Sequence, residues 1–127
     1  MKKLIAFLAA VFIAAPVMAD SEYPDISIGE LKKAIAEKKV AVIDVNGSGS
    51  YAKGHVPTAV DYAAVSKDLA SKLPSDKSTL VVAYCGGPSC SAYKKAANAA
   101  KELGYTNVKH LSAGISGWLQ AGEATEK

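Results

Sequence analysis

A run of apolar residues that ends at a cysteine constrains the fold of this chain more than any other feature. Residues 79–84 lead to Cys85, a loop rich in Gly, Pro and Ser follows, and an alanine-rich helical pattern begins at Ser91. This order predicts a strand, a short loop and a helix, with the thiol of Cys85 at the C-terminal end of the strand. In open α/β sheets, ligands bind at that edge.

The loop after Cys85 is suited to holding an anion. Its peptide N–H groups can converge on the sulfur, and the positive end of the following helix dipole adds to them. Both effects favour the thiolate, which is the reactive form of cysteine. We therefore predict that Cys85 is a nucleophile, and not a buried cysteine that only packs as a small hydrophobe. Gly86 and Gly87 lack a Cβ, so their backbone can curl around an anion. The predicted substrate-binding residues are Gly86, Gly87, Pro88, Ser89, Cys90 and Ser91.

Cys90 is the second of the two cysteines. Because the loop between them is so short, a Cys85–Cys90 bridge would serve redox chemistry more than architecture. Two interpretations stay open. Cys90 is a candidate resolving thiol, which attacks a sulfur-loaded Cys85, expels sulfide and leaves a disulfide. Alternatively, it packs against the fold where the helix begins.

Residues 1–19 have the pattern of a secretory signal peptide. Lys2 and Lys3 precede an apolar stretch over residues 4–15, and small residues over 17–19 fit a cleavage site. The apolar stretch is short for a membrane span, although an uncleaved anchor is the alternative. We expect a periplasmic or secreted protein without membrane attachment, in which residues 20–127 form one domain.

The charge balance gives no reason to expect nucleic-acid or membrane partners. The formal net charge is +3, and removing Lys2 and Lys3 leaves 3 − 2 = +1. All the cationic side chains are lysines, and the chain has no arginine. A bound anion would therefore be held by backbone N–H groups and lysine, without the bidentate fork of arginine.

Strand and helix patterns alternate along the chain, which predicts an α/β fold with a central parallel sheet and helices on both faces. A loop is expected at residues 46–50, and the tail from Gly122 is expected to be frayed. We expect strands near 40–45, 59–61, 79–84 and 107–111, a short strand running into a helix within 26–38, and helices near 51–54, 62–72, 91–103 and 115–120.

Other polar residues have structural and functional interpretations. Asp44 closes an apolar run, and its carboxylate is expected to bond backbone N–H groups of neighbouring loops more than to act as an acid or base. For His55, packing is favoured over catalysis. His110 is expected in a strand or at the surface. Lys94 and Lys95 form a solvated face or attract anionic donors. The two cysteines and two histidines do not match a zinc pattern, so no metal and no other cofactor is expected.

Three motifs in order resemble the single-domain rhodanese family of sulfurtransferases. They cover essentially the whole mature chain. The first has two parts, Asp44-Val45 at the end of an apolar run and the turn Gly54-His55-Val56-Pro57. The second is the strand, Cys85 loop and helix, and the third is Gly114 to Trp118. The resemblance implies a rhodanese-like fold. It also implies that Cys85 takes sulfane sulfur from a small sulfur-containing anion or persulfide donor, carries it as a persulfide, and passes it to a thiol, a protein or another nucleophile.

Departures from the family pattern refine this expectation. Asn46 stands where the family often has arginine, and the Cys85 loop lacks the cation that many members carry there. The resemblance then implies weaker binding of thiosulfate, so polysulfide or persulfide donors become favoured. Phosphate-ester hydrolysis is not expected, since related phosphatases use a longer loop with a closing arginine. The alternatives are a thiol-redox module that cycles a Cys85–Cys90 disulfide, and a non-catalytic sulfur-carrier or binding domain.

Overall fold

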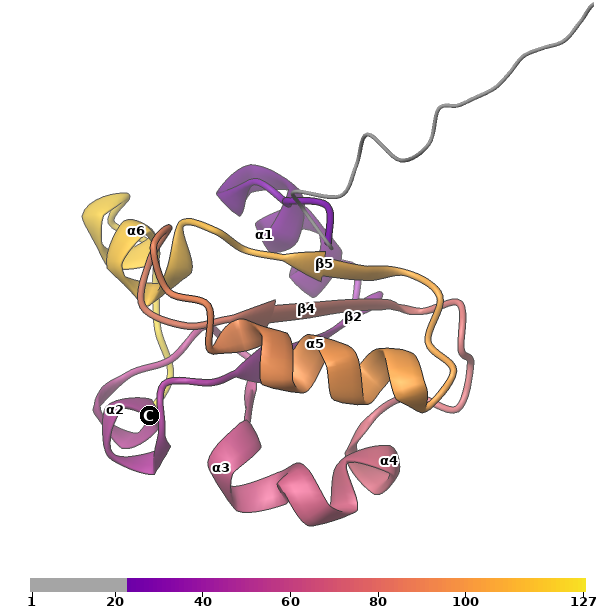
Figure 1. Ribbon diagram of the computed structural model, residues 1–127. Coiled ribbons are helices and arrows are strands. Elements are labelled where there is room, and N and C mark those ends of the chain that lie inside the picture. The colour runs from indigo at the N-terminus through magenta and orange to yellow at the C-terminus, as the bar shows by residue number, and fades with distance from the viewer. Residues whose placement is uncertain (1–22) are drawn as a thin grey trace, which may run out of the picture.

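The computed structural model describes residues 23–127, so the predicted signal peptide lies outside the described residues. Four parallel strands form one sheet in the order β3-β2-β4-β5. The sheet confirms the expected α/β class with a parallel core (Figure 1). The strands are β2 (Val40–Asp44), β3 (Val60–Asp61), β4 (Leu80–Tyr84) and β5 (Val108–His110).

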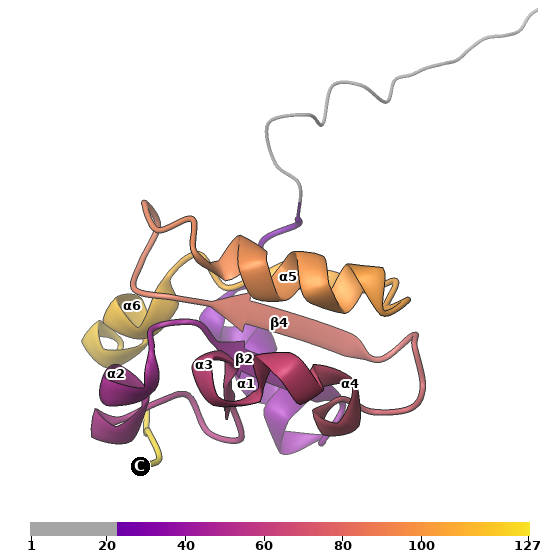
Figure 2. The same cartoon turned by 60° about the horizontal axis from the view of Figure 1, so that its bottom comes forward.

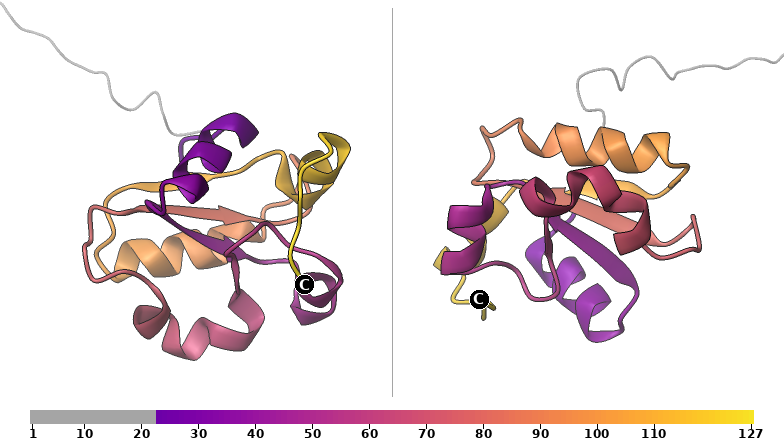
Figure 3. Two further views of the ribbon diagram at one scale, coloured as in Figure 1. Left: turned by 180° about the vertical axis from the view of Figure 1, so that it is seen from behind. Right: turned by 90° about the horizontal axis from the view of Figure 1, so that it is seen from below.

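Helices cover both faces of this sheet. Helix α5 packs against one face together with the helical segment after β3, and α1 lies on the opposite face (Figures 2 and 3). None of the helices in residues 23–127 is long and apolar enough to cross a membrane. The helices are α1 (Ile28–Ala36), α2 (Ser48–Lys53), α3 (Tyr62–Val65), the 3-10 turn η3 (Ser66–Asp68), α4 (Leu69–Lys72), α5 (Tyr93–Glu102) and α6 (Gly114–Gln120).

Strand β4 lies between β2 and β5, and its side chains alternate between two buried clusters. Val81 and Ala83 face the cluster beneath α5, whereas Val82 and Tyr84 face the cluster beneath α1 and α6. Such burial on both faces explains why the strand is apolar throughout and does not alternate with polar residues. Cys85 continues the first series, so its side chain belongs to the α5 side.

Three local predictions are corrected by the structure. The strand expected to lead into the first helix is wrong, because Ser27 caps α1 through reciprocal bonds with Glu30, and only an isolated bridge from Asp25 to His110 extends the sheet. The predicted helix over 62–72 is divided into α3, η3 and α4. The loop predicted at 46–50 is shorter, because α2 already begins at Ser48.

The C-terminal tail is docked, so the prediction of a frayed tail is wrong. Glu126 and His55 exchange two backbone hydrogen bonds, of 2.8 and 2.9 Å. The indole N–H of Trp118 donates to the Ala124 carbonyl at 2.8 Å, and Lys32 pairs with Glu123 at 2.9 Å. These contacts fasten the last residues to the loop before β3 and to α1.

The carboxyl ends of the parallel strands meet at one edge of the sheet. The loop between β4 and α5 lies at this edge, and α2 and α6 lie beside it (Figure 1). Strand β2 runs parallel to β4 with Asp44 opposite Tyr84. The residues that follow these two strands, Val45-Asn46 and Cys85-Gly86, therefore emerge next to one another.

Candidate functional site

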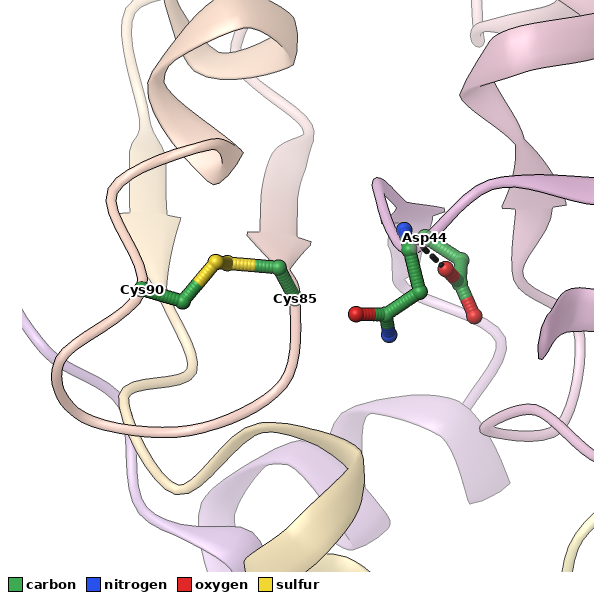
Figure 4. The surroundings of a disulfide bond; sticks show 4 residues. Asp44, Cys85 and Cys90 are labelled. Carbon is green, nitrogen blue, oxygen red and sulfur yellow. Dashed lines mark hydrogen bonds between the residues drawn. A yellow bond between two sulfur atoms is a disulfide. The ribbon is translucent and has the colours of Figure 1, made fainter.

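A disulfide between Cys85 and Cys90 occupies the end of β4. The two Cα atoms are 6.3 Å apart, and the bond closes the loop across its base (Figure 4). Cys85 is only 1% exposed, whereas Cys90 is half-buried. The structure therefore brings the two predicted sulfur residues together, with Cys90 the more accessible one.

Helix α6 holds the first part of the loop. Its amides at Ile115 and Ser116 donate to the carbonyls of Cys85 and Gly86, both at 3.0 Å. Gly114 begins this helix with φ +63°, and a Cβ there would stand 2.5–2.6 Å from backbone atoms of Gly86 and Gly87. The close approach requires glycine at position 114.

The two glycines of the loop itself are less constrained than expected. Neither Gly86 nor Gly87 has a positive φ. A Cβ at either position would lie 3.9–4.0 Å from its nearest neighbours, which is ordinary contact. The loop shape thus depends more on Gly114 than on the glycines that follow the cysteine.

Several loop amides are available to an anion. The amides of Gly86, Gly87, Ser89 and Ser91 donate no hydrogen bond within residues 23–127. Helix α5 also begins without a side-chain cap at Ala92. Backbone N–H groups without partners and the N-terminus of α5 therefore lie in the same loop as the two cysteines, and both kinds of group stabilise a bound negative charge.

Asp44 belongs to a buried bonding chain on the neighbouring strand. Its carboxylate accepts hydrogen bonds from the Asn46 backbone N–H and the Tyr84 hydroxyl, both at 2.7 Å. That hydroxyl in turn accepts from the Val56 N–H at 3.0 Å. Burial and the Asp44 carboxylate raise the pKa of Tyr84, so its hydroxyl stays protonated. The carboxylate of Asp44 points away from the disulfide (Figure 4), and its contacts are structural ones.

His55 connects α2 to the C-terminal tail. Its ring stacks on Tyr51 at 3.6 Å between centroids, and its Nδ1 donates to the Tyr51 carbonyl at 2.8 Å. Its backbone pairs with Glu126. The contacts of His55 are thus packing and backbone pairing.

A small hollow of about 200 Å³ lies between α2, α6 and the end of β2. Asn46, Ser50 and Lys53 line it together with Ile115, whose amide holds the Cys85 carbonyl. Asn46 also approaches the loop, since a Cβ on Gly86 would lie 3.9 Å from its Oδ1. The Asn46 Nδ2 is buried and has no partner within residues 23–127. Lys53 is thus a cation of this hollow, which the sequence did not indicate.

A second hollow, of about 400 Å³, lies on the Cys90 side of the loop. Cys90, Lys94 and His110 are among the residues that line it, whereas Lys95 is not. His110 lies in β5, as expected, but is only 8% exposed. Its ring stacks on Tyr93 with 3.4 Å between centroids. The structure therefore places His110 beside the disulfide loop, which the sequence did not indicate.

Two further residues that shape the site have weak sequence signals. Gly114 belongs to the third motif, but the motif gives no reason for glycine there. Tyr84 ends an apolar strand pattern, and nothing in the sequence marks the long-range bond of its hydroxyl to Asp44. No group of three or more His, Cys, Asp or Glu side chains in residues 23–127 is arranged to hold a metal ion.

Comparisons with known proteins agree with this geometry. The rhodanese-like domain model matches residues 27–121, so the chain belongs to the rhodanese-like domain family. It is 32% identical, over 116 residues, to the HTH-type transcriptional regulator Rv0324 of Mycobacterium tuberculosis. That match covers 91% of this chain but only 50% of the regulator, so this chain spans half the length of that relative.

Solved structures share the fold. The BH2092 protein from Bacillus halodurans superposes with a TM-score of 0.70 and 27% identity, covering 87% of this chain and 82% of that one. The human single-domain sulfurtransferase TSTD1 superposes with a TM-score of 0.59 and 22% identity, covering 76% and 96%. At that identity, the second likeness concerns the fold alone.

Proposed function

We propose that this protein is a sulfurtransferase in which Cys85 accepts sulfane sulfur and Cys90 can release it as sulfide. The observation that carries the proposal is the Cys85–Cys90 disulfide at the carboxyl end of β4, beside loop amides with no partner in the described chain. Membership of the rhodanese-like family supports sulfur as the transferred element.

The first step starts from the reduced protein. The Cys85 thiolate attacks the outer sulfur of a donor such as thiosulfate, polysulfide or a persulfide. The bond between that sulfur and the donor breaks, and the leaving group departs as sulfite, a shorter polysulfide or a thiolate. Cys85 is left as a persulfide, whose negative outer sulfur the loop amides can stabilise.

Two second steps compete for this persulfide. An external nucleophile can attack the outer sulfur, which completes transfer and restores the Cys85 thiolate. Alternatively, the Cys90 thiolate attacks the inner sulfur, expels hydrosulfide and forms the disulfide. The short separation of the two Cα atoms, 6.3 Å, favours the second route when no acceptor is bound.

We further propose that the donor approaches through the hollow beside Asn46 and Lys53. The hollow adjoins the segment that holds the Cys85 carbonyl. A single lysine and one amide group would grip a dianion less firmly than an arginine fork. This supports polysulfides and persulfides as better donors than thiosulfate.

The test compares reduced wild type with Cys85→Ala and Cys90→Ala in transfer from polysulfide to cyanide. Cys85→Ala is expected to abolish transfer. Cys90→Ala is expected to retain transfer, to keep its persulfide for longer and to release less sulfide. A Cys85→Ala protein that still turned over would overturn the proposal, whereas unchanged sulfide release by Cys90→Ala would remove the resolving role of Cys90.

We also propose that the protein works outside the cytoplasm, because residues 1–19 carry the signal pattern. An oxidising compartment also permits a Cys85–Cys90 disulfide to persist. N-terminal sequencing of the exported protein should find a start near Asp20. Recovery of the chain with Met1 intact would contradict cleavage.

A further inference from the structure

The hollow on the Cys90 side of the loop has the features of a second binding site. It is lined from the loop by Cys90, from α5 by Lys94, from β5 by His110, and from the segment before α1 by Asp25. Its volume of about 400 Å³ suits a small molecule. The donor hollow beside Asn46 shares none of these lining residues, so the two approaches to the loop are separate.

A buried polar atom at this hollow has no partner in the described chain. Only 8% of the His110 surface is exposed, and its Nε2 has no hydrogen bond within residues 23–127. Burying such an atom costs free energy unless a bound molecule supplies the missing hydrogen bond. His110 is among the residues that line the same hollow as Cys90.

We propose that this hollow binds a small zwitterionic amino thiol, such as cysteine, which opens the disulfide by attack on Cys90. The proposal rests on the proposed function only in treating the disulfide as an intermediate of turnover. Cys90 is half-buried whereas Cys85 is 1% exposed, so a thiol arriving from this side meets the sulfur of Cys90 first.

Reduction of the disulfide consumes two molecules of the small thiol and needs no other reductant. The sulfur of the incoming thiol bonds to the Cys90 sulfur, the Cys85–Cys90 bond breaks, and Cys85 leaves as a thiolate. The proton of the incoming thiol passes to His110. A second thiol then attacks the mixed disulfide, restores the Cys90 thiol and releases the small molecule as its own disulfide.

The surroundings of His110 suit it to take that proton. Burial, with Lys94 adding, lowers the pKa of His110, while Asp25 opposes the shift. The imidazole is therefore neutral near pH 7 and can act as a base. Tyr93 stacks on the ring and restricts its orientation.

The charges around the hollow suit the two ends of an amino acid. Lys94 offers a cation to a carboxylate, and Asp25 offers a carboxylate to an ammonium group. One oxygen of Asp25 accepts the Ser112 N–H at 2.9 Å, which holds the side chain in place. Lys95 is the next residue on α5 and lies outside the hollow, so it provides a matched control.

The first arm of the test maps the mixed disulfide. Oxidised wild type is mixed with cysteine, quenched with an alkylating reagent, and analysed by peptide mass spectrometry. We expect cysteine on Cys90 and the alkyl group on Cys85. The reverse distribution would overturn the proposed direction of attack. This arm uses no sulfur donor, so it can fail or succeed independently of the proposed sulfur transfer.

The second arm measures reduction rates with cysteine and with the uncharged 2-mercaptoethanol, each normalised to its rate on a free dialkyl disulfide. Lys94→Ala and Asp25→Asn should each lower the preference for cysteine by about twofold to fivefold. Lys95→Ala should leave it unchanged. An equal preference in wild type and both hollow variants would overturn the choice of an amino thiol.

The third arm tests His110 through the pH dependence of reduction. His110→Gln should slow reduction near neutral pH, and the deficit should shrink as the pH rises and the small thiol ionises by itself. A purely structural effect would slow reduction by a similar factor at every pH, and that result would overturn the role as proton acceptor.

Discussion

Gly114 and Gly86 approach so closely that a Cβ on Gly114 would stand 2.5 Å from the Gly86 carbonyl carbon. This contact joins α6 to the loop that carries both cysteines. Gly114 directly precedes Ile115 and Ser116, whose amides bond the Cys85 and Gly86 carbonyls. Contacts from outside the Cys85–Cys90 loop therefore help to set its shape.

Gly114→Ala should destabilise the fold and distort the loop. Its φ of +63° disfavours a side chain, and the close contact adds to the strain. We expect a loss of at least about 2 kcal/mol in the free energy of unfolding, measured by denaturant titration. Gly87→Ala is the matched control, because its Cβ would meet its neighbours at 4.0 Å. Equal stability of the two variants would contradict this role of Gly114.

Tyr84→Phe should cost about 1–3 kcal/mol in the free energy of unfolding. The change leaves one oxygen of Asp44 and the N–H of Val56 without their partner inside the protein. Tyr62→Phe is the control, since the Tyr62 hydroxyl makes no hydrogen bond within the described chain and the residue is half-buried. Chemical denaturation measures both variants, and a neutral Tyr84→Phe would argue against the buried bonding chain.

His110 should make the stability of the oxidised protein depend on pH. Burial lowers its pKa in the folded protein below the ordinary value of 6.5. Below pH 6.5 the unfolded chain therefore binds more protons than the folded one, so stability falls as pH drops through the folded pKa and is fully present above 6.5.

Denaturant titrations over about pH 5–8 should show this slope in wild type and a flatter one in His110→Gln. The same slope in both proteins would mean that other groups cause the pH dependence.

The docked tail should be protected from hydrogen exchange. The Glu126 N–H donates to the His55 carbonyl at 2.9 Å, and the His55 N–H donates to the Glu126 carbonyl at 2.8 Å. Both amides should therefore exchange more slowly than the backbone amide of Thr125, which is exposed and donates no hydrogen bond within residues 23–127. Exchange of Glu126 at the rate of an unstructured peptide would restore the interpretation of a frayed tail.

The sequence predicted the central part of the fold because its signals are local. The apolar runs before Asp44 and Cys85 and the alanine-rich pattern after Ser91 each define an element by their own residues. The docking of Glu126 on His55 has no such signal, because a short polar tail shows no periodicity. It depends on contacts between residues far apart in the chain.

The candidate site shows the same difference between local signals and long-range contacts. The position of Cys85 at the end of a strand follows from the neighbouring residues, whereas the position of His110 depends on strand order. Strand β5 pairs with β4, so that His110 lies opposite Ala83, two residues before Cys85. A sequence pattern alone does not specify that neighbour.

The most direct test of sulfur transfer to Cys85, and of sulfide release by Cys90, is the intact mass of the reduced wild-type protein after addition of one equivalent of polysulfide. A transient gain of one sulfur atom should be followed by loss of two hydrogens relative to the reduced protein, with release of sulfide. Cys90→Ala should stop at the gain of one sulfur. A wild-type protein whose mass never changes, or that forms the disulfide without first gaining sulfur, would contradict the proposed route through a Cys85 persulfide.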